Sequence, residues 1–151
     1  MPTRPITALL LALGCAGAAA AAQAQHSVRI DHHSGPVTAH YRGDIAVDHR
    51  QVGAAAPAGR ASTLRCQWTA RMDVARAATA ANGRTMHRSF VSGPVASGHR
   101  SGWCSGQQEA IARDVARQTI TLDRHLQAVA REDHDVLRAE LDALHGPVGA
   151  G

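Results

Sequence analysis

Residues 63–76 read TLRCQWTARMDVAR, and apolar side chains alternate with polar ones along the whole stretch. A side-chain period of two predicts a β-strand with one buried face and one solvated face. The apolar set includes Cys66 and Trp68. We therefore expect this segment to form the central strand of a small sheet.

Shorter alternating segments precede this strand. Three of them read as strands: residues 27–32, 37–42 and 45–50. We interpret Arg42-Gly43-Asp44 as a three-residue hairpin loop, because this register pairs Tyr41 with Ile45 and keeps the apolar side chains on one face. The same register turns His49 inward, opposite Val37.

Two turns are compatible with the Asn-Gly sequence that follows the central strand. A three-residue turn, Ala81-Asn82-Gly83, aligns Val74 with Phe90 and places Gly83 where a left-handed backbone is needed. A two-residue Asn-Gly turn would pair Val74 with Val91 instead. We prefer the first, because it matches apolar side chains across the two strands.

The next strand is predicted over residues 85–91, with an extension toward Ala96. Pro94 lacks a backbone N–H, so it indicates an edge strand or a bulge at that point. Residues 97–106 are rich in glycine and serine. We expect them to form a loop.

From Gln107 onward the apolar side chains recur with a helical period, which predicts a C-terminal helical segment. Ser105 and Gln108 fit a capping box at its start, and Gly146-Pro147 is a stop signal. An unbroken helix of this length would be nearly 60 Å long. A compact domain of this size is roughly 35–40 Å across, so either the helix breaks or its end projects and pairs with a second copy.

The position of Asp133 indicates where the helical segment breaks. It falls within the apolar stripe, where an unpaired carboxylate is costly. We favour a break at this residue, with Asp133 as the N-cap of a second helix. The β-branched residues 119–121 are the alternative site.

These elements predict the α+β class: an antiparallel β-meander of four to five strands packed against a C-terminal helix or broken helix pair. The charge distribution fits this arrangement. Residues 25–106 carry ten Arg and four acidic residues, whereas residues 107–151 carry five Arg and eight acidic residues. We expect the basic sheet to face or flank an acidic helix.

Residues 1–24 have the three parts of a secretory signal peptide: a positive charge, a short apolar run and an A-x-A site. The predicted organisation is a signal peptide over 1–24, one domain over 25–146 and a short flexible tail over 147–151. No later segment approaches the roughly 20 apolar residues of a membrane-spanning helix. We expect a periplasmic or secreted protein; a lipoprotein attached through Cys15 is the alternative.

Removal of the signal peptide would leave two cysteines, Cys66 and Cys104. An even number of cysteines in an oxidising compartment predicts a disulfide. Closing a loop of this length should contribute roughly 4 kcal/mol to stability.

The ten histidines are the one unusual feature with chemical content. Imidazole is a common ligand of zinc, copper and nickel, so a periplasmic metal-binding protein is one hypothesis. We name His32, His49 and His40 as candidate ligands of a transition metal, because half of the histidines lie in this part of the chain. However, the sequence contains no HxxxH, CxxC or HExxH motif. The missing spacing favours dispersed surface or structural histidines.

No catalytic motif is present, so we expect a protein that is not an enzyme. A hydrolytic site in the 97–106 loop is a third hypothesis. It would combine Ser101 or Ser105 with His99 and an acidic residue from the helix. Export and the scarcity of aromatic residues argue against nucleic-acid binding. The leading hypothesis is a non-catalytic exported domain that binds a protein or another envelope component. A homodimer through the C-terminal helix is a further expectation.

Overall fold

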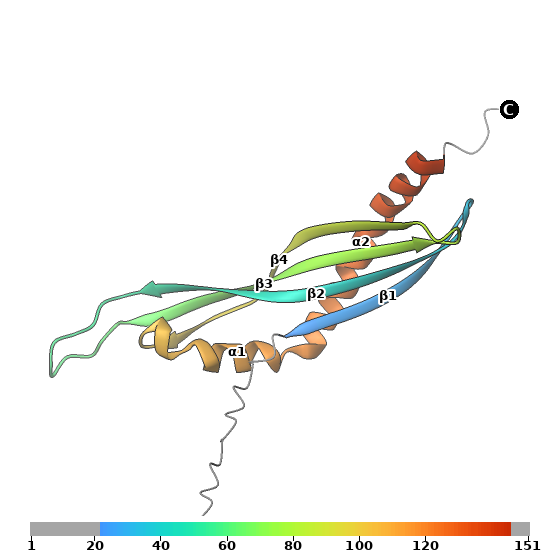
Figure 1. Ribbon diagram of the computed structural model, residues 1–151. Helices are drawn as coiled ribbons and strands as arrows, with labels where there is room; N and C mark the ends of the chain where they lie inside the picture. Colours follow the sequence, from blue (N-terminus) through green and yellow to red (C-terminus); the bar gives the residue numbers. More distant parts are fainter. Residues whose placement is uncertain (1–21, 146–151) are drawn as a thin grey trace, which may run out of the picture.

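The computed structural model describes residues 22–145, which form one antiparallel sheet followed by helices (Figure 1). The elements are β1 (Gln23–His32), β2 (Gly35–Val52), β3 (Arg65–Ala80), β4 (Thr85–Ser101), the 3-10 turn η1 (Cys104–Gly106), α1 (Gln108–Ala116) and α2 (Thr119–His145). The strand order is β1-β2-β3-β4, and each strand is antiparallel to its neighbour. The predicted α+β class and four-to-five-strand meander are confirmed.

Most of the predicted signal peptide and all of the predicted tail lie outside residues 22–145. Residues 1–21 of the predicted signal peptide and the predicted tail over 147–151 lie outside the described residues. Strand β1 begins at Gln23, before the predicted domain start at residue 25, and Ala24 is buried in the core. The sheet therefore uses residues that we assigned to the signal peptide.

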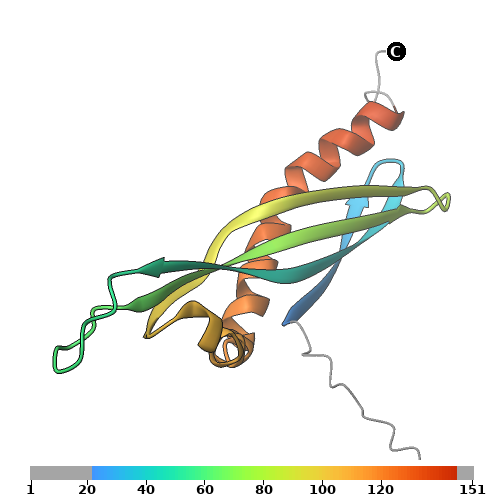
Figure 2. The same cartoon turned by 60° about the vertical axis from the view of Figure 1, so that its left-hand side comes forward.

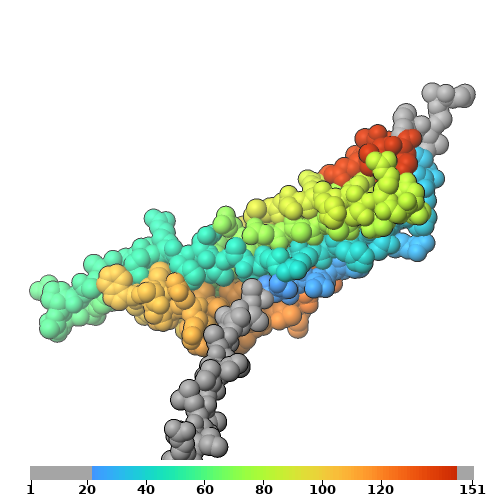
Figure 3. All heavy atoms as spheres, in the orientation of Figure 1, coloured from blue at the N-terminus to red at the C-terminus, as the bar shows by residue number. Residues whose placement is uncertain are grey.

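The domain is elongated because its strands are long. Strands β2, β3 and β4 contain 18, 16 and 17 residues, which corresponds to about 55 Å of extended chain. Figure 2 shows α2 crossing one face of this sheet obliquely, and the space-filling view in Figure 3 shows the extended shape. The helical segment does break into two pieces, α1 and α2, as its length predicted. With 27 residues, α2 is about 40 Å long.

The predicted hairpin loop at residues 42–44 is wrong, because β2 is a single continuous strand. Gly43 lies within it, opposite Val74 of β3. A Cβ at this position would lie 2.6 Å from Sδ of Met72. Glycine is thus needed here to make room for a core methionine rather than to form a turn.

The hairpin between β3 and β4 agrees with the preferred register. Val74 lies opposite Phe90, and Gly83 has a φ of +81°. The strand β4 is at the edge of the sheet, and its register shifts near Pro94, as the proline indicated. The predicted loop over 97–106 is wrong in its first half, since β4 continues to Ser101.

The helical segment breaks between α1 and α2, directly before residues 119–121, so the favoured break at Asp133 is wrong. Asp133 lies inside α2 and is 4 % exposed. The predicted capping box is also absent, because the N-cap of α1 is Gln107 and no side chain caps this end. A buried carboxylate can stay within a helix when other residues satisfy it.

Two hydrophobic clusters hold the helices against the sheet. The larger one packs the inner faces of β1, β2 and β3 against α2. The smaller one packs Cys66 and Trp68 of β3 against Ile111 and Val115 of α1. Cys66 and Cys104 form the predicted disulfide, which ties the start of the helical segment to the central strand.

A buried polar network satisfies Asp133. Tyr41, Arg76 and Arg88 lie opposite one another on β2, β3 and β4, so their side chains form one row on the inner face. Asp133 accepts hydrogen bonds from Tyr41 Oη at 3.0 Å, Arg76 Nη1 at 2.7 Å and Arg88 Nη1 at 2.7 Å. Arg76 also pairs with Glu140. The predicted contact between a basic sheet and an acidic helix is made here.

This network raises the pKa of two of its members. Burial disfavours the charged guanidinium of Arg76, but the hydrogen bonds and charges of Asp133 and Glu140 outweigh burial and raise its pKa. Burial, followed by the charge of Asp133 and its hydrogen bond, raises the pKa of Tyr41 to about 12. Both groups therefore keep their protons under all ordinary conditions.

We expect Tyr41 to titrate near pH 12, well above an ordinary tyrosine at about 10. Because the unfolded chain loses this proton first, the stabilisation is complete below pH 10. It is lost as the pH rises from about 10 to about 12. The chain has one tyrosine, so the near-ultraviolet absorbance of tyrosinate reports this residue alone.

The titration should be read only where circular dichroism shows an intact sheet. Asp133→Asn should lower the pKa of Tyr41, because the carboxylate charge contributes to the shift. A wild-type midpoint near 10 in the folded protein would contradict the buried network.

Candidate metal centre

The candidate metal centre lies where the β1–β2 turn meets the last turn of α2. Strand β1 ends at His32, residues 33–34 form the turn, and β2 begins at Gly35. Gly35 has a φ of +116°, which a residue with a side chain rarely adopts. Because Ile30 points into the core, the period of two also directs His32 inward, toward α2.

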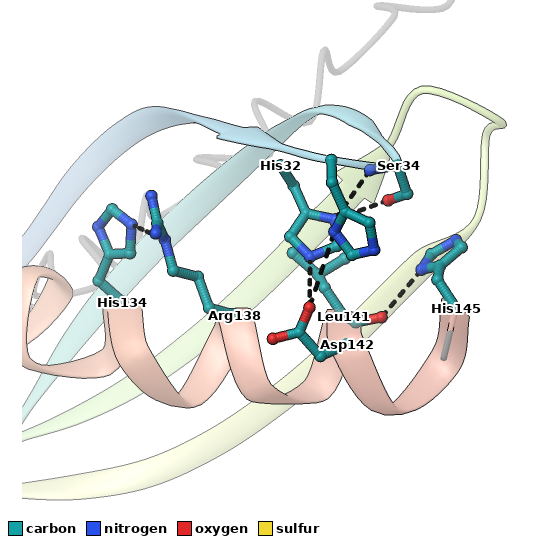
Figure 4. Close-up of polar contacts among 8 residues, drawn as sticks. His32, Ser34, His134, Arg138, Leu141, Asp142 and His145 are labelled. Atoms are coloured by element: carbon teal, nitrogen blue, oxygen red, sulfur yellow. Dashed lines mark hydrogen bonds and ion pairs between the residues drawn. The ribbon is translucent and has the colours of Figure 1, made fainter. Parts of the chain in front are cut away.

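His32 is held from both of its ring nitrogens (Figure 4). Its Nε2 lies 3.0 Å from Oδ1 of Asp142, and its Nδ1 lies 2.7 Å from Oγ of Ser34. The carboxylate only accepts, so Nε2 carries the proton in this state, and Nδ1 accepts from the backbone N–H of Ser34 at 3.3 Å. The His32 side chain is 6 % exposed, which limits its alternative orientations.

His33 and Asp142 complete a group of three donors. Nδ1 of His33 lies 3.7 Å from Oδ1 of Asp142, and the rings of His32 and His33 are 4.0 Å apart. One donor atom from each residue lies within 4.8 Å of the other two. Ligand atoms around a tetrahedral zinc ion are about 3.3 Å apart. The three side chains therefore need only small movements to share one ion.

The electrostatic surroundings favour a cation at this position. The last carbonyl groups of a helix carry a partial negative charge, and Asp142 lies in the final turn of α2. The side chains of His33 and Asp142 are 33 % and 57 % exposed, so an ion can reach them from solvent. When Nε2 of His32 binds a metal, the ring proton is on Nδ1, and Oγ of Ser34 can accept a hydrogen bond from this N–H.

The structure brings only one of the three predicted ligands to this site. His32 is a member of it, but His40 lies on the outer face of the sheet, where its Nδ1 is 2.7 Å from Oγ of Ser27. His49 is exposed and lies fourteen residues from Gly35 along β2, which is roughly 45 Å. It pairs with Trp68 rather than lying opposite Val37. These three histidines do not converge.

Sequence reasoning missed His33 and Asp142. His33 belongs to the turn, where a period of two says nothing about direction. Asp142 comes from the helix, 110 residues after His32. One local signal was available, since Asp142 and His145 are three residues apart and so lie on the same side of a helix.

The residues of the hydrolase hypothesis do not assemble into a catalytic group. His99 and Ser101 lie in β4, and Ser105 lies in η1. Among the described residues, no hydrogen bond joins these three side chains. Ser92 Oγ lies 2.9 Å from Nε2 of His125, but within residues 22–145 no carboxylate is hydrogen-bonded to this histidine to orient it.

Two further findings bear on function. Within residues 22–145, no helix is both long enough and apolar enough to cross a membrane. Comparisons with protein-family models, curated proteins and solved structures found no match to this chain. Its function is therefore inferred from the geometry of its own side chains.

Proposed function

We propose that this chain is an exported, non-catalytic protein that binds a divalent transition-metal ion through His32, His33 and Asp142. The observation that carries the proposal is the convergence of three donor atoms within 4.8 Å. Export rests on the signal-peptide pattern of residues 1–24. Binding of a further envelope component and a homodimer through α2 stay predictions.

The donor set favours particular metals. Two imidazoles and one carboxylate suit zinc, copper, nickel or cobalt. Calcium and magnesium require shells made almost entirely of oxygen ligands. We therefore expect Zn²⁺ and Cu²⁺ to bind, and Ca²⁺ and Mg²⁺ not to compete.

A bound ion would also join two elements that are far apart in sequence. His32 and His33 come from the end of β1 and its turn, whereas Asp142 comes from the end of α2. In Figure 3 the last turns of α2 (red) lie at the same end of the molecule as the β1–β2 turn. The ion would therefore cross-link helix and sheet at the end opposite the Cys66–Cys104 disulfide.

Isothermal titration of the mature protein, purified without a histidine tag, should give one Zn²⁺ site per chain. At free zinc of about 100 times Kd, binding should stabilise the fold by about 2.7 kcal/mol, and a chelator should reverse this. His33→Ala and Asp142→Asn should each weaken binding at least about tenfold, because even the loss of an outer-shell partner costs 10- to 100-fold. Both side chains are solvent-accessible, so the fold should survive these changes.

His40→Ala and His49→Ala are the matched controls. Each removes an exposed histidine outside the cluster, and each should retain wild-type affinity. The proposal is wrong if wild type binds no zinc, or if the controls weaken binding as much as His33→Ala does.

A further inference from the structure

We infer that His145 supplies a fourth ligand and closes the metal site, an inference that rests on the proposed function. His145 is the last residue of α2 and lies one helical turn beyond Asp142. Residues three apart on a helix are neighbours on its surface. An Asp-x-x-His pair at the end of α2 can therefore direct both side chains at one ion.

The observed position of the ring is close to what such a site requires. The ring centroid of His145 lies 6.1 Å from that of His32 (Figure 4). With Zn–N bonds of about 2.0–2.1 Å, two imidazoles on one tetrahedral ion have centroids roughly 5 Å apart. The observed separation is about 1 Å larger than this. His145 therefore has to move toward His32, and its Nε2 has to turn toward the group of three donors, before it can bind the same ion.

The hydrogen bond of His145 also fits a ligand. Its Nδ1 lies 2.9 Å from the carbonyl oxygen of Leu141, which can only accept, so Nδ1 carries the proton. This leaves the lone pair of the neutral ring on Nε2. Histidines that bind metals commonly donate their other N–H to a backbone carbonyl in this way.

The fourth ligand determines which kind of site this is. Catalytic zinc sites keep one position for water or substrate, whereas sites with four protein ligands are closed. With His145 the ion would have three imidazoles and one carboxylate and no position for substrate. A closed site fits metal storage, transfer or stabilisation of the fold, and excludes hydrolysis at this ion.

Cobalt substitution tests this directly, because tetrahedral Co²⁺ has an intense visible spectrum. The wild-type spectrum should not change when thiocyanate is added, since no position is open for the anion. His145→Ala should bind Zn²⁺ at least about tenfold more weakly, and its Co²⁺ spectrum should shift with thiocyanate. His145→Asp, which keeps a ligand, should restore insensitivity to thiocyanate.

His134→Ala is the control, because His134 also lies on α2 but is hydrogen-bonded to Arg138, outside the cluster. It should behave as wild type does. The inference is wrong if His145→Ala binds zinc as tightly as wild type does and the wild-type cobalt spectrum responds to thiocyanate. In that case the proposed function stands, because wild type still binds zinc. If wild type binds neither metal, both fail.

Discussion

Replacing Asp133 with alanine is expected to lower the free energy of unfolding by about 3–5 kcal/mol, the usual cost of breaking a buried ion pair by removing one partner. The side chain is 3 % exposed and accepts three hydrogen bonds from the sheet. Without it, the Arg76 side chain, which is 0 % exposed, retains only the partly exposed Glu140 as an acidic partner. Urea unfolding followed by circular dichroism measures this loss.

Two further variants distinguish loss of the buried polar network from the general effect of substituting a residue in α2. Asp135→Ala changes an exposed acidic residue of α2 and should alter stability by no more than about 0.5 kcal/mol. The double variant Arg76→Met and Asp133→Leu should recover much of the loss, because apolar replacement of a buried pair is often neutral or stabilising. If Asp133→Ala is as stable as Asp135→Ala, the carboxylate is not buried in solution.

Loss of the disulfide is expected to have the second large effect. Cys66 and Cys104 are 38 residues apart, and a loop of that size predicts a loss of roughly 4 kcal/mol. Cys104→Ala is the better variant, because Cys66 is fully buried and its removal would leave a cavity. The main effect is on the unfolded chain, whose conformational freedom increases.

A reductant provides the internal control. It should destabilise wild type by about the same amount as Cys104→Ala, and it should leave Cys104→Ala itself unchanged. Ser105→Ala, at the adjacent exposed position, should match wild type. Equal stability of oxidised and reduced wild type would show that the disulfide does not stabilise this fold.

Asp133 shows how far local patterns lead and where they stop. Its place in the apolar stripe of the helix predicted a break that does not occur, because Tyr41, Arg76 and Arg88 of the sheet satisfy the buried carboxylate. The phase of the central strand was also informative, because Arg76 continues the inward-facing set of Met72 and Val74. Pairing these two signals would have predicted a helix that continues through Asp133 and forms a buried ion pair with Arg76.

Gly43 shows why one turn was misassigned. Glycine is common in turns because it tolerates positive φ, but it also occurs in strands where another side chain needs its space. Only the packing of Met72 against Gly43 distinguishes these two roles. The role of Gly83 was clearer from the sequence than that of Gly43. Gly83 follows an asparagine at the end of a strand, which is typical of a hairpin turn.

The sequence by itself determined the α+β class, the central strand, the β3–β4 register and the cysteine pair. These depend on local periodicity, on turn chemistry or on a choice between few partners. Only the tertiary structure decided that Arg76 meets Asp133, 57 residues later, and that His32 meets Asp142, 110 residues later. Such contacts depend on how α2 docks across the sheet, which is set by the packing of many side chains together and leaves no periodic trace in the sequence.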